Sequence, residues 1–142
     1  MHYLMIAIPF VWSGMIGAIS FIEAPLKFRA PNVTREIGLG IGKIVFQALN
    51  RIELVLAAII IACLIFAGPQ AANVYYILGV VVLFLLTQTV WLLPRLNARV
   101  VAIIAGQNIP SSNLHLVFVA LEIGKMISLV YLGIALLGDF GL

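Results

Sequence analysis

Four long apolar stretches, separated by short segments, make up most of this chain. They cover about residues 3–24, 43–67, 73–93 and 112–137, and each is followed by a proline or a glycine. A helix needs about 20 mostly apolar residues to cross the hydrocarbon core of a bilayer. Because proline removes a backbone N–H and clashes with the preceding turn, we expect each helix to end there. The pattern predicts an all-α integral membrane four-helix bundle forming a single transmembrane domain.

The composition argues against a water-soluble domain. Of the 142 residues, 64% are hydrophobic and only 9% are charged, which is more apolar surface than a soluble globule of this length can bury. The first stretch has no Lys or Arg before it, unlike a cleavable signal peptide, so we expect it to remain in the mature protein.

Basic residues are unevenly distributed between the connections. The first and third connections and their edges hold Lys27, Arg29, Arg35, Lys43, Arg95 and Arg99, whereas the second connection, residues 68–72, has none. Basic connections favour the cytoplasmic side of a membrane. We therefore expect a multi-pass protein of a bacterial inner membrane, with both termini on the non-cytoplasmic side.

Small residues predict close helix packing. If Asn32 caps the second helix, that helix begins near Val33, and Gly38 and Gly42 then form a small-residue pair on its first turns. The first helix carries a second such face, formed by Ser13, Gly14, Gly17 and Ser20. Because four short helices enclose little interior, we expect a homo-oligomer in contact with membrane lipids. A membrane protein partner fits the same surfaces, whereas nucleic acid does not.

The second and fourth stretches resemble one another. Residues 45–53 align with residues 117–125, and Pro25 and Pro94 follow the stretch before each of them. A duplication would give two helical hairpins related by a pseudo-two-fold axis along the membrane normal. The alignment is short and mostly apolar, so a chance match remains the alternative.

Polar residues inside the stretches form the candidate site. They are Glu53, Glu122, Lys125, Gln88, Asn50, Arg51 and Glu23. From the rise of about 1.5 Å per residue, Glu53 and Lys125 lie at one depth, with Gln88 close to it. An isolated charge there costs about 3 kcal/mol, so we expect Glu53 to pair with Lys125. Glu23 and Arg51 share a second depth and are expected to pair as well.

Two functions fit this cluster, and a third, a lipid- or quinone-binding redox subunit, is less favoured because haem ligands are missing. The first is binding or translocation of a small polar solute or ion, with Glu53 and Glu122 as titratable groups and Lys125 as their counter-charge. The second is a non-catalytic accessory or structural subunit in which the ion pairs only fix the helix packing. A cavity reaching Glu53 or Lys125 would favour the first function, and a dry, closed pair would favour the second.

Several site chemistries are disfavoured. His2 and His115 are expected at opposite membrane faces, and Cys63 has no second cysteine, so we expect no haem, metal or other cofactor. Residues 38–43 lack the spacing of a phosphate-binding loop. The serines have no histidine at matching depth to activate them, so an enzyme is the less favoured class.

A family resemblance rests on two sets of residues. The first set is Trp12, Gly14, Phe21, Ala24, Pro25 and Phe28, and the second is Trp91, Pro94, Arg99, Gly106, His115, Glu122 and Lys125. These residues resemble patterns of small uncharacterised bacterial four-helix membrane proteins and are distantly similar to the copper-resistance D group. The resemblance implies a four-helix membrane fold. Its copper branch implies metal import, but this chain lacks the histidine- and methionine-rich ligand sets which that role needs.

Overall fold

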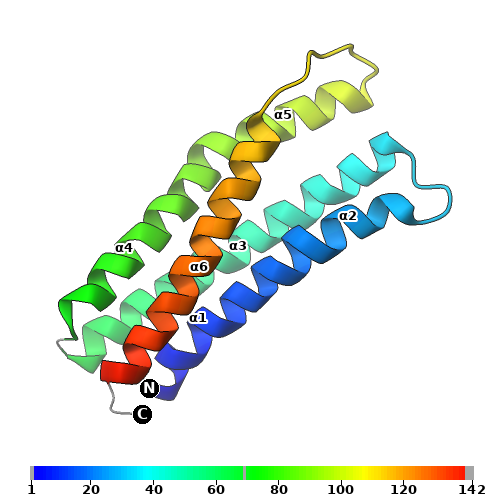
Figure 1. Ribbon diagram of the computed structural model, residues 1–142. Coiled ribbons are helices and arrows are strands. Elements are labelled where there is room, and N and C mark those ends of the chain that lie inside the picture. The colour runs from blue at the N-terminus through cyan, green and yellow to red at the C-terminus, as the bar shows by residue number, and fades with distance from the viewer. Residues whose placement is uncertain (1, 69, 140–142) are drawn as a thin grey trace.

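The fold is described from a computed structural model that covers residues 2–68 and 70–139 (Figure 1). Four continuous helical segments run along the chain. The first comprises α1 (His2–Ile16), the π-helical η1 (Gly17–Glu23), α2 (Ala24–Leu26) and the 3-10 turn η2 (Lys27–Arg29). The second is α3 (Arg35–Ala67), the third comprises α4 (Ala72–Leu86), π-helical η3 (Thr87–Leu92) and α5 (Leu93–Ile104), and the fourth is α6 (Leu114–Asp139). The all-α prediction is confirmed.

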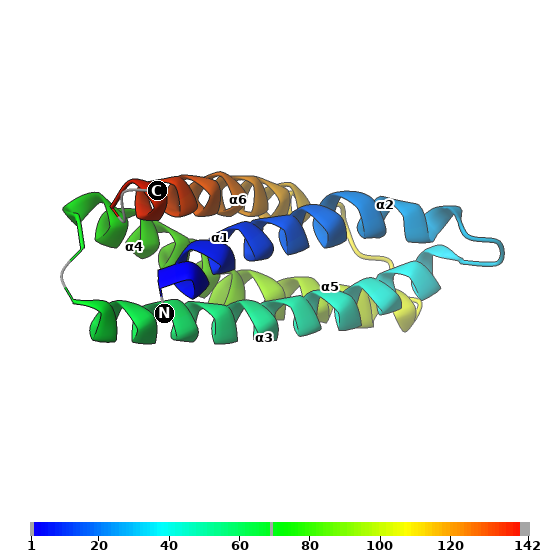
Figure 2. The same cartoon turned by 90° about the horizontal axis from the view of Figure 1, so that it is seen from below.

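The four segments are antiparallel neighbours in one elongated bundle (Figures 1 and 2). Both termini and the connection between α3 and α4 lie at one end, which we call the terminal end. The other two connections lie at the opposite end, which we call the connection end. All four segments are long and apolar enough to cross a membrane. The 33 residues of α3 span about 50 Å at about 1.5 Å per residue, well beyond the roughly 30 Å of a hydrocarbon core.

The terminal half of the bundle has a continuous apolar core. Fourteen buried residues from all four segments form it, among them Trp12, Ile60, Val81 and Leu132, each fully buried. A smaller apolar cluster lies further toward the connection end, around Leu92, Leu93 and Phe118. The large core leaves the terminal half closed, whereas the other half is packed less completely.

The prolines do not end the first and third helices, which corrects the prediction. Pro25 and Pro94 lie within continuous helical segments, each two residues after a π-helical stretch. The N–H of Ala24 donates to Ile19 O, and that of Leu93 donates to Gln88 O, which is the wider i to i−5 pattern. Widening the helix just before each proline accommodates the missing N–H and the ring. Both helices therefore continue beyond their predicted ends.

The start of α3 also differs from the prediction. Thr34, not Asn32, is its N-cap, since the Thr34 hydroxyl accepts the Ile37 N–H at 3.3 Å. Asn32 instead turns the chain with a φ of 64°. Gly38 and Gly42 are buried against the side chains of Phe28 and Lys27 of the same chain. These two glycines therefore do not provide the exposed face on which oligomerisation was predicted.

Candidate functional site

Lys125 lies at the centre of a buried polar network. Its ammonium nitrogen is 2.6 Å from Glu53 Oε1, 2.8 Å from Glu122 Oε1 and 2.5 Å from Gln88 Oε1. An ammonium has three N–H donors, and three acceptors from α3, α6 and η3 surround this one. The predicted Glu53–Lys125 pair is confirmed, as is the placement of Gln88 at the same depth.

Both carboxylates accept further hydrogen bonds. Trp12 Nε1 donates to Glu53 Oε1 at 2.8 Å. Gln88 Nε2 donates to Glu122 Oε1 at 2.6 Å, and Ser20 Oγ donates to Glu122 Oε2 at 2.7 Å. The network thus joins side chains from all four helical segments.

Helical spacing and burial explain why this network is stable. Glu122 and Lys125 are three residues apart on α6 and share one face of that helix. Glu53, Gln88, Glu122 and Lys125 are each at most 2% exposed. Desolvating such charges costs several kcal/mol each, and only a complete set of partners offsets that cost. Among the described residues, every buried side-chain nitrogen and oxygen has a hydrogen-bond partner.

A second polar contact lies beside the network. Asn50, buried on α3, donates from Nδ2 to Thr89 Oγ1 at 2.9 Å, and Thr89 in turn donates to Leu85 O. Thr89 lies in η3, just as Ser20 lies in η1. The π-helical η1 therefore presents the Ser20 hydroxyl to Glu122 on α6, and η3 presents the Thr89 hydroxyl to Asn50 on α3.

The predicted Glu23–Arg51 pair is not formed. Glu23 lies 3.4 Å from Lys27 on its own helical segment. Arg51 is exposed on α3 and makes no ion pair within the part of the chain that the structure describes. Equal depth did not bring these two residues together because Arg51 is on the outward face of α3, opposite the buried Glu53 and Asn50.

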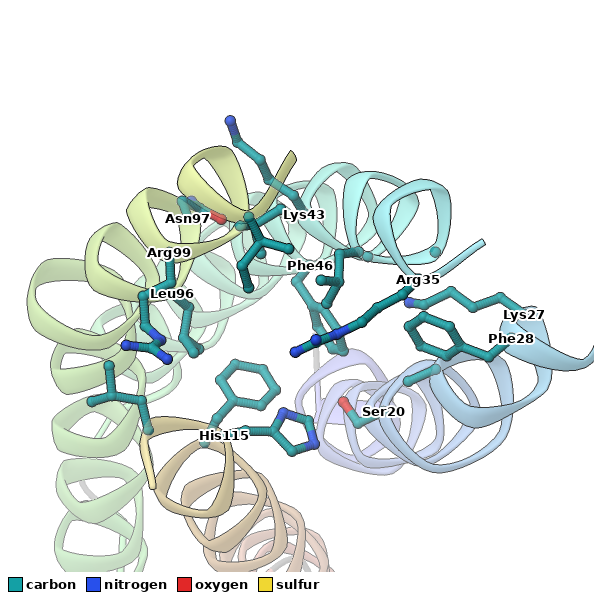
Figure 3. Close-up of a pocket in the computed structure, with 18 of the residues that line it drawn as sticks. Ser20, Lys27, Phe28, Arg35, Lys43, Phe46, Leu96, Asn97, Arg99 and His115 are labelled. Atoms are coloured by element: carbon teal, nitrogen blue, oxygen red, sulfur yellow. The ribbon is translucent and has the colours of Figure 1, made fainter. Parts of the chain in front are cut away.

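A cavity of about 630 Å³ opens at the connection end (Figure 3). Its walls come from all four helical segments and from the connection that precedes α6. Apolar side chains line the deep part, including Phe46, Leu93 and Phe118. Sequence analysis assigned the basic residues of this region only to membrane orientation, so it missed the cavity.

The cavity lining is strongly basic. It includes Lys27, Arg35, Lys43 and Arg99, which are four of the eight Lys and Arg residues, and none of the five Asp and Glu residues. His115 also lines it. Figure 3 shows Arg35 and His115 directed into the cavity and Lys43 directed away from it. Such a lining produces a positive potential that attracts anions.

Ser20 connects the cavity to the buried network. It lines the cavity and donates the hydrogen bond to Glu122. Beside it, the rings of Phe46 and Phe118 also line the cavity and meet edge to face, with centroids 4.9 Å apart. Each ring lies about one helical turn nearer the connection end than Asn50 or Glu122. The aromatic pair and Ser20 thus lie between the cavity and the charges.

Sequence reasoning missed three residues of the network. Trp12, Ser20 and Thr89 were assigned to helix packing or left unassigned, yet Trp12 and Ser20 donate to network carboxylates and Thr89 accepts from Asn50 beside the network. Depth along the helix is a usable signal, since each of them lies near the level of its partner. Contact also depends on the direction in which a side chain points around its helix axis. The two π-helical stretches change that direction in a way that the sequence does not show.

Among residues 2–68 and 70–139, no group of three or more His, Cys, Asp or Glu side chains is placed to hold a metal ion. His2 and His115 lie near opposite ends of the bundle, and Cys63 is a free thiol in the terminal half of α3. In comparisons with known proteins, no family model, curated protein or solved structure matches this chain.

Proposed function

We propose that this chain is a multi-pass membrane protein that binds a small polar solute or ion at the connection end and holds the buried charge network as a closed barrier behind it. One observation carries the proposal: Ser20 is at once a wall of the cavity and a hydrogen-bond donor to Glu122. A solute that displaces the Ser20 hydroxyl would therefore act directly on the buried charges. Intramembrane charges are typical of substrate and ion pathways, and Ser20 connects these charges to the cavity although none of the four central network residues lines it.

The two halves of the bundle support binding from one side. The connection half contains the cavity, whereas the terminal half is filled by the large apolar core. Translocation needs a second state in which this core opens on the other side of Glu53 and Lys125. Binding needs no such change, so it is the primary proposal, and translocation is its extension.

The second candidate function is an accessory or structural subunit. It is favoured by a specific observation: the four central network residues are closed off from the cavity and fully paired. In that function the ion pairs fix helix register, and the cavity is incidental. This function replaces the first if Ser20→Cys does not react in the experiment below.

We infer that the two helical hairpins are pseudo-repeats, which extends the sequence alignment. Glu53 pairs with Lys125, and Phe46 packs on Phe118, with the same number of residues separating the partners in each pair. The Ser20–Glu122 and Asn50–Thr89 contacts are also counterparts, because Asn50 and Glu122 are separated by that same spacing, and Ser20 and Thr89 by the spacing between Pro25 and Pro94. A π-helical stretch precedes the proline in both halves. Side chains that pair with their own counterparts support an axis through the centre of the bundle.

The experiment uses conservative cysteine substitutions in a Cys63→Ala background. Ser20→Cys places a thiol in the cavity wall, and Ser13→Cys places one in the packed terminal half, where Ser13 is buried. Each protein is reconstituted in liposomes and treated from one face at a time with a membrane-impermeant anionic thiol reagent. We expect Ser20→Cys to react from the connection face only and Ser13→Cys to stay unreactive from both faces.

The outcomes separate the candidate functions. If Ser20→Cys fails to react from either face in folded protein, the cavity is not a solute site and the accessory-subunit function replaces it. If Ser13→Cys reacts from the terminal face, the barrier opens and the function extends to translocation.

A further inference from the structure

We propose that the basic cavity binds an anionic amphiphile that enters from the membrane, with its charged head at Arg35 and His115 and its tail along the aromatic wall. This inference rests on the proposed binding function and names its ligand class. The cavity volume of about 630 Å³ falls in the usual range for small-molecule sites, roughly 300–1,000 Å³, and is far larger than a single inorganic anion requires.

The charged part of the site is formed by side chains with free donors. Arg35 and His115 make no hydrogen bond or ion pair within the described ranges, and both are directed into the cavity (Figure 3). Lys27 and Arg99 already have partners, because Lys27 lies 3.4 Å from Glu23 and Arg99 Nη2 donates to Pro110 O at 2.6 Å. Guanidinium binds phosphate or carboxylate in bidentate fashion, so Arg35 is the principal contact we assign to the head.

No carboxylate lines the cavity, but two acidic residues outside the lining partly offset its charge, since Glu23 pairs with Lys27 and Glu36 is next to Arg35. A group of basic side chains with few acidic neighbours is destabilised by mutual repulsion until an anion binds. Lys27 adds to the potential from a fixed position, with its ammonium 5.4 Å from the Phe46 ring centroid. The head of the ligand is therefore expected to carry at least one full negative charge.

The apolar part of the site continues onto the outer surface of the bundle. Phe21 and Phe28 line the cavity and remain 37% and 44% exposed. A wall shared between the cavity and the lipid-facing surface allows a tail to lie partly inside and partly in the bilayer. An ion that enters only from water would gain nothing from this arrangement.

Most of the cavity lies beyond the hydrocarbon core. About 20 residues counted from the terminal end of each helix cross that core. The cavity residues of α3, α5 and α6 fall beyond that distance, within 35–46, 93–103 and 114–118. Phe46 and Phe118 thus lie at the edge of the hydrocarbon, whereas Arg35 lies about 16 Å further out along α3 at about 1.5 Å per residue, with its side chain directed into the cavity (Figure 3).

The test measures binding of dodecyl phosphate to the full chain in neutral dodecyl maltoside micelles by titration under native mass spectrometry. The wild-type protein is compared with Arg35→Ala and with Arg29→Ala. Arg29 lies in the same connection and is exposed, but it does not line the cavity, so the two variants lose the same charge. We expect one retained dodecyl phosphate, weakened about ten-fold or more by Arg35→Ala and less than about two-fold by Arg29→Ala.

His115→Asn provides a second test, because it leaves the Lys and Arg charges of the cavity unchanged. We expect it to weaken dodecyl phosphate binding less than Arg35→Ala does. Equal weakening by Arg29→Ala would show non-specific attraction and overturn the site. Equal binding of inorganic phosphate would overturn the tail, and equal binding of dodecanol would overturn the charged head. If dodecyl phosphate fails to bind while Ser20→Cys still reacts from the connection face, the ligand class is wrong and the proposed binding function stands.

Discussion

At the scale of single residues, the network assigns unequal roles to its charges. Lys125 neutralises two carboxylates, whereas Glu53 and Glu122 each contact one ammonium. Removing the lysine leaves two buried carboxylates without a counter-charge. Removing Glu53 leaves a one-to-one pair. The two substitutions should therefore differ in cost although they break the same contact.

We expect Lys125→Met to lower the free energy of unfolding by about 3–5 kcal/mol, the usual cost of leaving a buried charge uncompensated. Glu53→Gln keeps an oxygen for Lys125 and Trp12 and should cost less than about 1.5 kcal/mol. Equilibrium unfolding in mixed detergent micelles, followed by circular dichroism, gives both values. Equal costs for the two variants would contradict the assigned roles.

The hydroxyl of Ser20 gives a second prediction at this scale. Ser20→Ala removes a donor to the buried Glu122 and should cost about 1–2 kcal/mol. Ser128→Ala is the matched control, because Ser128 donates only to Gly124 O of its own helix, a bond whose loss is nearly neutral. The same unfolding measurement applies, and similar values for the two serines would argue against the link between cavity and network.

Some of the site was predictable from single residues. The depth of Glu53, Gln88 and Lys125 follows from counting helical rise, and their contact followed because an unpaired buried charge is so costly. The pairing of Glu23 with Arg51 failed because rise fixes depth but not azimuth. The tryptophan donor to Glu53 was missed for a similar reason, since an indole has both an apolar body and a polar N–H.

At the scale of elements, the largest departure from the sequence prediction is that two prolines do not end their helices. Pro25 and Pro94 were read as helix ends, yet the preceding turns widen and the helices continue. The penalty for proline applies to an α-helix with i to i−4 bonding, and a π-helical stretch changes that geometry locally. A sequence pattern contains no clear signal for this change, so the π-helical stretches before Pro25 and Pro94 were not predicted.

The cap of α3 can be tested by amide exchange. Thr34→Ala removes the side-chain acceptor for the Ile37 N–H and should cost about 1 kcal/mol locally, which is about a five-fold faster exchange in the first turn. Asn32→Gly serves as the control, because glycine tolerates the φ of 64° at that position. Faster exchange after Asn32→Gly but not after Thr34→Ala would restore Asn32 as the cap.

Packing between the first and fourth helices gives another prediction. A Cβ at Gly133 would lie 2.6 Å from the Phe10 ring, whereas a Cβ at Gly79 would meet nothing within 4 Å. We expect Gly133→Ala to destabilise the bundle by about 1–3 kcal/mol. Gly79→Ala should be neutral or stabilising by up to about 1 kcal/mol. Melting temperatures of the two variants in one detergent decide the matter, and a more stable Gly133→Ala protein would be inconsistent with this close approach.

At the scale of the whole molecule, the arrangement of the four segments was well predicted. Apolar length alone set the number of helices, and short connections made them antiparallel neighbours. The cavity could not be predicted, because it depends on how far the helices extend beyond the hydrocarbon core and on which side chains turn inward. Arg35 contributes to the cavity from the first turn of α3, and neither the apolar stretch from residue 43 nor a helix start near Val33 indicated which way its side chain turns.

The arrangement makes a prediction about sidedness. With Cys63 replaced by Ala, cysteines at Asn32 and Asn108 should react with an impermeant reagent from one face of the membrane, and a cysteine at Gln70 from the other. We expect the first two to be cytoplasmic, since basic residues surround those connections. Labelling of intact cells and of inverted vesicles gives the answer, and reaction of all three from one face would rule out four spans.

The contact of Glu53 with Lys125 has one more consequence, for how the two hairpins can associate. Two copies of the first hairpin would bring glutamate against glutamate at the centre with no buried lysine to neutralise them. In two copies of the second hairpin, each lysine would keep Glu122 of its own helix as a partner. The first half therefore cannot self-assemble into a neutral bundle. When the chain is cut between α3 and α4, the first fragment should therefore fold only with the second, so the intact polypeptide guarantees a one-to-one stoichiometry that separate halves would reach only by balanced synthesis.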